Sequence, residues 1–209
     1  MAGVLKVLLV LFISPIIGFV AGWIIANLVY LLSWKATPRV NGVFKKLQII
    51  TALSLALSHG TNDAQKTMGI ITLALLISGQ IPTFVVPQWV IFMCAAAIAI
   101  GTSVGGWQLI RTLGSKFYKI RPVHGFSAQI TSAAVILTAS LIGGPVSTTQ
   151  VVSTAIMGVG AADRVNKVRW GVAGEILSAW LFTIPSTALL AAGIYWLIEN
   201  VVPLISTWL

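Results

Sequence analysis

Long apolar segments, separated by short polar loops, restrict what this chain can fold into more than any other feature of its sequence. Hydrophobic residues make up 57% of its 209 residues and charged residues only 8%, whereas soluble domains carry about 25% charged residues. A helix of about 20 apolar residues crosses a hydrocarbon core of about 30 Å. The sequence therefore predicts an all-α polytopic membrane protein that passes several times through the cell membrane.

The apolar segments predict about six membrane segments within one transmembrane domain, residues 1–209. They lie at 7–34, 47–78 and 87–110, at two places within 122–160, and at 170–198. The stretch 122–160 is either two spans with an external turn or a re-entrant hairpin whose tip stops near the midplane. As a helix, 146–160 would be only about 22 Å long, which favours the hairpin or a short half-helix.

The net charge of +9 comes mainly from three clusters of Lys and Arg in short loops. They are Lys35, Arg39, Lys45 and Lys46; Arg111, Lys116, Lys119 and Arg121; and Arg164, Lys167 and Arg169. Basic residues in short loops are typical of the cytoplasmic side of a membrane protein. Their position therefore indicates cytoplasmic loops and argues against a nucleic-acid partner.

A polar motif, Ser-His-Gly-Thr-Asn-Asp-Ala-Gln-Lys-Thr-Met-Gly, interrupts the second apolar segment at residues 58–69. Asp63 is one of only four acidic residues, and a charge at bilayer depth costs at least about 2.5–3.5 kcal/mol. An unbroken helix over 47–78 would measure about 48 Å, longer than the hydrocarbon core. We therefore expect a break at 58–67, where Gly60 supplies backbone freedom and irregular backbone lines a cavity.

A second polar break is expected at 143–150, which reads Gly-Gly-Pro-Val-Ser-Thr-Thr-Gln. Ser147, Thr148 and Thr149 would lie at the start of a helix, where hydroxyls and unpaired backbone N–H groups face the positive end of the helix dipole. Such an arrangement suits an oxyanion such as phosphate. The alternative is structural, because Ser and Thr in membrane helices often bond their own backbone.

The first break offers a different chemistry. Asn62 and Asp63 supply oxygen ligands for Na⁺, or a carboxylate that can carry a proton. Alternatively, Asp63 and Lys66 are spaced i,i+3 and could simply neutralise each other. No second His or Cys stands near His59, so we expect no metal site there and interpret His59 as a packing or supporting residue.

Two motifs together resemble a known family. Residues 58–69 resemble the signature of the inorganic phosphate transporter (PiT) family. Residues 144–150, followed by 157–160, resemble that family's second motif, and the likeness continues through 168–171. The resemblance implies symport of inorganic phosphate with Na⁺, or with H⁺ as a metal–phosphate complex in many bacterial members. We therefore expect no enzyme activity and no cofactor besides the transported ions.

The resemblance also implies roles for individual residues. Asn62 and Asp63 would help to bind the coupling cation and phosphate, and the three hydroxyl residues 147–149 would contact phosphate. Gln65 and Lys66 match the variant found in the family's C-terminal half and join the expected substrate site.

This chain departs from the family in carrying one copy of each motif, whereas family transporters have two inverted halves with both motifs in each. It resembles the C-terminal half alone, and whether it is a fragment or a complete product stays open. We expect a homo-oligomer or association with the missing N-terminal half, and no transport by a monomer. The alternative is a non-transporting membrane subunit or a fragment of a split phosphate permease.

The sequence leaves open the coupling ion and the preference among phosphate, arsenate and sulfate. An intramembrane serine hydrolase is disfavoured, because the chain has no Gly-x-Ser-x-Gly elbow and Ser58 and His59 are only sequence neighbours.

Overall fold

The fold is entirely helical over the residues that the structure, a computed structural model, describes: 2–37, 39–115 and 120–206. The helices are α1 (Ala2–Leu32), α2 (Val40–Ile77), α3 (Gln88–Ser115), α4 (Pro122–Leu141), α5 (Thr148–Arg164), the 3-10 helix η1 (Val165–Lys167) and α6 (Trp170–Ser206). The predicted all-α class is confirmed. Of the basic residues expected in cytoplasmic loops, Lys116 and Lys119 lie outside the described residues.

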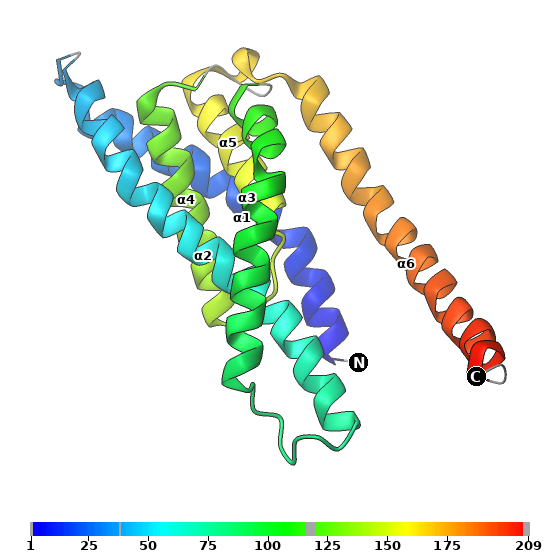
Figure 1. The fold of residues 1–209 in the computed structure, drawn as a ribbon. Helices are drawn as coiled ribbons and strands as arrows, with labels where there is room; N and C mark the ends of the chain where they lie inside the picture. Colours follow the sequence, from blue (N-terminus) through cyan, green and yellow to red (C-terminus); the bar gives the residue numbers. More distant parts are fainter. Residues whose placement is uncertain (1, 38, 116–119, 207–209) are drawn as a thin grey trace. The chain divides into compact units, whose positions relative to one another are not determined.

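The chain forms two units, residues 1–168 and 169–209. In the first, α1 packs chiefly against α5, and α2 packs against α4. The short helix α4 also contacts α1 and α5, so α4 and α5 lie at the centre while α2 and α3 lie on one side (Figure 1). The second unit is the single long helix α6 with its short lead-in. The prediction of one transmembrane domain over all 209 residues stays a prediction.

Within the described part of the chain, four helices are long and apolar enough to cross a membrane: the candidate spans are Leu9–Leu32, Val40–Ile77, Gln88–Trp107 and Leu177–Asn200. The other two long helices, α4 and α5, have 20 and 17 residues and run antiparallel as a hairpin (Figure 1). They contain more than half of the buried polar residues among those described, and the others lie on α1 and α2. Whether this hairpin spans the bilayer or returns from its midplane stays a prediction.

The expected break at 58–67 is wrong, because α2 continues as one helix of 38 residues through the whole motif. Several of the polar side chains bond within the helix instead of interrupting it. Ser58 and Thr61 donate to the carbonyl oxygens of Ser54 and Leu57 at 2.8 and 2.7 Å. Gly60 alone costs only about 1 kcal/mol relative to Ala in a helix. A helix of about 57 Å exceeds the hydrocarbon core, but a long helix can tilt or extend beyond it.

The expected interruption at 143–150 is present, as a turn that joins α4 to α5. Gly143 has φ +66°, a conformation that L side chains rarely adopt. Its N–H donates to Ser140 O at 3.1 Å, and the N–H of Gly144 donates to Ala139 O at 2.9 Å. These two bonds form a Schellman motif, which ends α4 and satisfies its last carbonyl groups.

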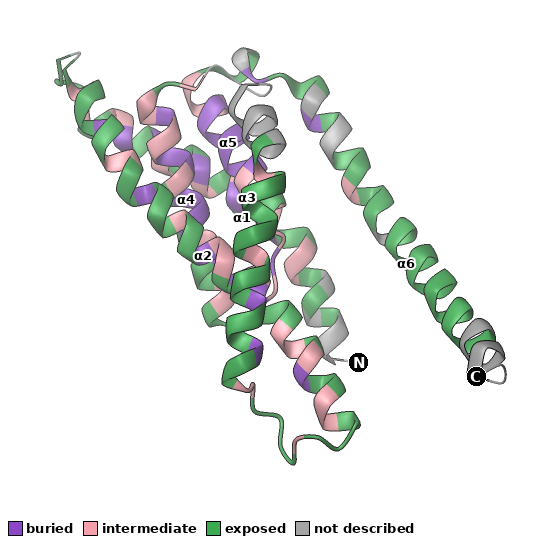
Figure 2. Ribbon diagram, viewed as in Figure 1, coloured by how far each residue is buried: buried purple, intermediate pink, exposed green. Residues whose placement is uncertain are grey.

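The interior of the first unit is small and partly polar, while large apolar side chains face outward (Figure 2). Its apolar core joins Ile136, Val146 and Val151. Residues 153–160 of α5 are all buried, and glycines let α1 approach α5 closely. A Cβ on Gly22 would lie 2.6 Å from Ala155 O, and one on Gly158 would overlap Phe19 O.

Replacing Ile136 with alanine should destabilise the first unit, because this fully buried side chain fills the centre of the apolar core. Leu/Ile→Ala changes in cores cost about 2–5 kcal/mol. Leu137, its neighbour on α4, is 47% exposed, so Leu137→Ala is the matched control. Thermal unfolding in detergent should show a clear decrease in Tm for the first variant only. Equal decreases would contradict the assigned core.

Candidate functional site

Asp63 is the centre of a hydrogen-bonded cluster that joins α2 to the start of α5. Its Oδ1 accepts bonds from Asn62 Nδ2 and Lys66 Nζ, both at 3.0 Å. Its Oδ2 lies 3.2 Å from His59 Nε2 and accepts a bond from Thr148 Oγ1 at 3.2 Å. Asp63 and Thr148 are 85 residues apart in sequence. The structure therefore brings the two predicted polar motifs together.

The carbonyl oxygen of Val146 is the second acceptor of this cluster. Lys66 Nζ donates to it at 2.7 Å and Asn62 Nδ2 at 3.1 Å. The Oδ1 of Asn62 accepts a bond from Ser140 at 3.3 Å, so Asn62 bonds residues on both sides of the α4–α5 turn. Val146 lies in that turn, before α5 begins, and its carbonyl is free to bond side chains. These contacts fix the turn against α2.

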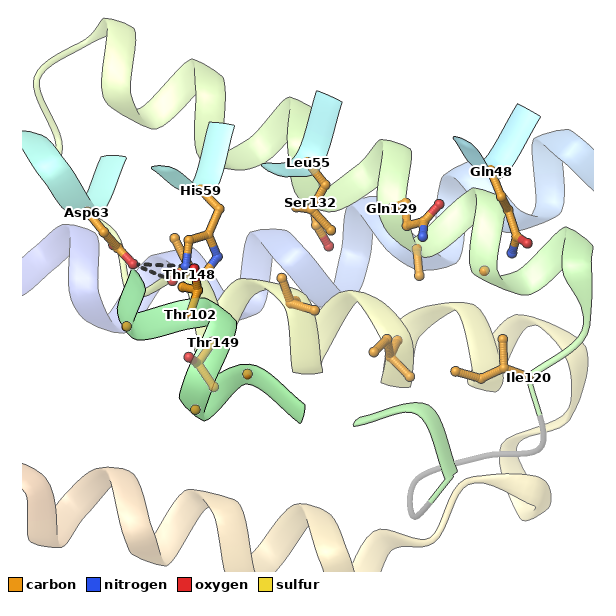
Figure 3. Close-up of a pocket in the computed structure, with 17 residues that line it drawn as sticks. Gln48, Leu55, His59, Asp63, Thr102, Ile120, Gln129, Ser132, Thr148 and Thr149 are labelled. Carbon is orange, nitrogen blue, oxygen red and sulfur yellow. Dashed lines mark hydrogen bonds and ion pairs between the residues drawn. The ribbon is translucent and has the colours of Figure 1, made fainter. Parts of the chain in front are cut away.

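A cavity of about 820 Å³ begins at this cluster and extends along α2. Side chains at a helical spacing on α2, including Gln48, Leu55, His59 and Asp63, line one wall. Figure 3 shows His59, Asp63 and Thr148 at one end, Leu55 and Ser132 in the middle, and Gln129 and Gln48 at the other end. Polar groups thus lie along the length of a mainly apolar cavity.

A second hollow of about 350 Å³ lies beside the same motif. Its lining includes Asn62, Gln65, Lys66 and Ser140, together with the glycines and proline of the α4–α5 turn. Along α2 it extends towards the C-terminal end, whereas the larger cavity extends towards the N-terminal end. The Asp63–Lys66 pair therefore lies between two hollows.

The predicted site residues divide among four positions. Asn62, Asp63, Lys66 and Thr148 form the cluster itself, and Thr149 is an exposed residue of the larger cavity. Gln65 is exposed on the second hollow. Ser147 precedes α5 without a side-chain bond to its first turn, and among the described residues it lines neither hollow.

Two members of the cluster were not among the predicted site residues. His59 was interpreted as a packing or supporting residue, and in the structure it lies 3.2 Å from Asp63 Oδ2 and lines the larger cavity. Its i,i+4 spacing from Asp63 was the available signal. The carbonyl of Val146 leaves no signal in side-chain chemistry, because its role depends on where the turn places it.

The cluster combines groups that suit an anion with groups that suit a cation. Hydroxyls, a lysine and the start of α5 favour an oxyanion. Carboxylate, amide and backbone oxygens are ligands that a hard cation prefers. No group of three or more His, Cys, Asp or Glu residues that could hold a metal ion occurs within the described part of the chain.

Comparisons with known proteins point in one direction. A family model described as the phosphate transporter family matches residues 1–191. The chain is 46% identical over 202 residues to a probable low-affinity inorganic phosphate transporter of Bacillus subtilis, covering 95% of this chain and 60% of that protein. A similarly described protein of Rhizobium meliloti is 46% identical over 195 residues, covering 92% of this chain and 58% of that protein.

A solved structure described as the sodium-dependent phosphate transporter resembles the fold with a TM-score of 0.69 and 32% sequence identity. The match covers 78% of this chain and 41% of that one. The chain thus spans about 60% of the length of the two relatives named above. These proteins are described as transporters, which agrees with the expectation that the chain is not an enzyme.

Proposed function

Because the chain belongs to the phosphate transporter family, we propose that it forms one half of a cation-coupled transporter of inorganic phosphate. It is a multi-pass membrane protein whose two family motifs meet at Asp63 and Thr148. That contact is the single observation that carries the proposal. It connects a residue suited to a cation with the start of a helix suited to an oxyanion.

Phosphate would bind beside the start of α5, at the end of the larger cavity. Thr148 and Thr149 line that end. The Thr149 hydroxyl would donate a hydrogen bond, the Thr148 hydroxyl would exchange its bond to Asp63 for one to phosphate, and Ser147 would add a third hydroxyl. His59 would supply a ring nitrogen close to the bound anion. Asn62 and Asp63 would hold the coupling cation, H⁺ or Na⁺, whose charge offsets that of phosphate. Gln65 and Lys66 would contact an ion that enters from the second hollow.

Transport requires more than this chain by itself. The larger cavity and second hollow both open at the surface of a single set of helices, and relatives contain a further 40% of sequence beyond the matched part. We propose that a second copy, or a complementary half, completes the pathway between them. The solved relative is described as a sodium-dependent phosphate transporter.

Radiolabelled phosphate uptake into proteoliposomes tests the function. We expect uptake only in preparations that native mass spectrometry shows to contain an assembled species, either a homo-oligomer or the chain with a complementary half. A monomeric preparation should bind phosphate without transporting it. Binding and uptake absent from every assembled species would overturn the proposal and favour the alternative, a non-transporting membrane subunit.

Removing the Thr148 hydroxyl should weaken phosphate binding while leaving the fold intact. Thr148→Val keeps the shape of the side chain and removes one hydrogen bond of about 0.5–1.5 kcal/mol, which predicts about a two- to tenfold increase in Kd. Thr61→Val is the control, because Thr61 is exposed and bonds only the carbonyls of its own helix. Equilibrium dialysis with labelled phosphate measures both. An unchanged Kd for Thr148→Val would remove Thr148 from the site.

A further inference from the structure

We propose that the ammonium group of Lys66 occupies the cation position beside Asp63, so that this chain takes no Na⁺ there. The inference deepens the proposed function, because it assigns the specificity of the same site for its coupling ion. It follows from two contacts of the lysine, from the chemistry of the oxygens involved and from the way the lysine reaches them.

The contacts of Lys66 are those of a bound cation. Its Nζ lies 3.0 Å from Asp63 Oδ1 and 2.7 Å from Val146 O. The two oxygens come from different segments, one from α2 and one from the turn before α5. The ammonium therefore bridges the two motifs. It does more than neutralise a neighbour on its own helix.

The oxygens that Lys66 bonds belong to the class that coordinates Na⁺ in transporters. Carboxylates, amide oxygens and backbone carbonyls outside regular helix are the usual ligands. Asp63 supplies the first and Val146 O the third, while Asn62 donates its Nδ2 hydrogens to both of these oxygens and accepts a bond from Ser140 at its Oδ1. Without the ammonium, the Asp63 carboxylate and the Val146 carbonyl would be open to a dissolved cation.

The lysine and a dissolved cation exclude each other at this position. Both carry a full positive charge, and they would have to share the same two oxygens at hydrogen-bond distance. A covalently tethered group also competes at a high effective concentration, set by its short linker. Free Na⁺ loses translational entropy when it binds, whereas the lysine is already part of the chain. We therefore expect the Lys66 ammonium, and not Na⁺, to occupy this position.

Water and ions can reach the position, so exclusion by Lys66 has a measurable consequence. The Lys66 side chain is 39% exposed and lines the second hollow, whose volume is about 350 Å³. Removing the Lys66 charge would expose the oxygens of Asp63 and Val146 to ions in this hollow. In the wild-type chain, where Lys66 excludes Na⁺, the coupling ion would be a proton, carried on phosphate or on a side chain of the site.

Sodium binding by the purified full-length chain tests the inference directly. Wild type, Lys66→Met, Lys66→Arg and the control Lys45→Met are compared with radiolabelled Na⁺ in nanodiscs. We expect saturable binding only in Lys66→Met, since the arginine keeps the charge and Lys45 lies on α2 outside both hollows. Na⁺ should also raise the Tm of Lys66→Met alone, which shows that the bound variant is folded.

Phosphate binding provides a second readout, which depends on the proposed function. Na⁺ is replaced by N-methyl-D-glucamine at constant ionic strength. The phosphate Kd of wild type should then change less than about twofold, and that of Lys66→Met at least about tenfold. A tenfold change lies within the usual range of coupling between two sites. A sodium requirement in wild type, or no sodium binding by folded Lys66→Met, would overturn the inference. If none of the proteins binds phosphate, the proposed function fails, and the sodium-binding comparison still decides the role of Lys66.

Discussion

Replacing Gly158 with alanine should separate α1 from α5 and cause a large loss of stability. A Cβ at this position would overlap the carbonyl oxygen of Phe19 and lie 3.0 Å from the backbone N of Trp23. Both atoms belong to the backbone of α1, so no side-chain rotation relieves the overlap. Overpacking usually costs about 1–3 kcal/mol, and a clash between two helix backbones should reach or exceed the upper end of that range.

Gly60→Ala is the matched control. Gly60 lies inside α2, where an added Cβ would have no heavy atom within 4 Å. Helix propensity then favours alanine by about 1 kcal/mol. Thermal unfolding in detergent should show a large decrease in Tm, or loss of folded protein, for Gly158→Ala and an unchanged or higher Tm for Gly60→Ala. The same Tm for both variants would show that α1 and α5 are farther apart than described.

Replacing Asp63 with asparagine should abolish concentrative phosphate uptake by the assembled transporter. The carboxylate accepts bonds from His59, Asn62, Lys66 and Thr148. Hydrogen bonds to charged groups contribute about 1.5–3 kcal/mol each, so losing even one at the transport site predicts at least about a tenfold decrease in uptake. Asparagine keeps the shape but carries no charge, and it can neither neutralise Lys66 nor carry a proton.

Uptake of radiolabelled phosphate into proteoliposomes measures this effect, with binding by equilibrium dialysis beside it. Asp163→Asn, which removes a carboxylate near the end of α5 and far along that helix from Thr148, serves as the control for net charge. Coupled uptake retained in full by folded Asp63→Asn would exclude the carboxylate from the transport cycle.

The helical fold could be predicted from the sequence, because apolar segments of sufficient length have few alternatives in a bilayer. That the two motifs contribute to one site was implied by the family resemblance. Asp63 and Thr148 are indeed hydrogen-bonded in the structure, although they are 85 positions apart.

The continuity of α2 could not be predicted in the same way. The break was inferred from helix length and from the polarity of residues 58–67, on the assumption that a polar stretch must interrupt a membrane helix. In the structure, hydroxyls bond their own helix and the remaining polar groups bond α4, α5 and the turn between them. The polar side chains thus form hydrogen bonds with residues that are distant in sequence, and a single sequence does not show which residues those are.

The role of Lys66 shows the same limit on a smaller scale. Its i,i+3 spacing predicted the pair with Asp63, and the structure contains that pair. The second acceptor that Lys66 bonds is the carbonyl of Val146. Its position depends on the turn between α4 and α5, which requires the positive φ of Gly143. The backbone conformation of Gly143 thus helps to place the Val146 carbonyl, which Lys66 bonds from 80 positions away.

The helices that line the larger cavity differ in the hydrogen bonds that their side chains make. Helices α2, α4 and α5 are cross-connected by the Asp63 cluster and by the bond from Thr51 to Gln129. Helix α3 contributes Gly101, Thr102, Gly105 and Gly106 to the cavity, and the hydroxyls of Thr102 and Ser103 bond only their own helix. The wall that α3 provides therefore consists mainly of small residues, so the position of the α3 backbone, and not a bulky side chain, sets the width of the cavity on that side.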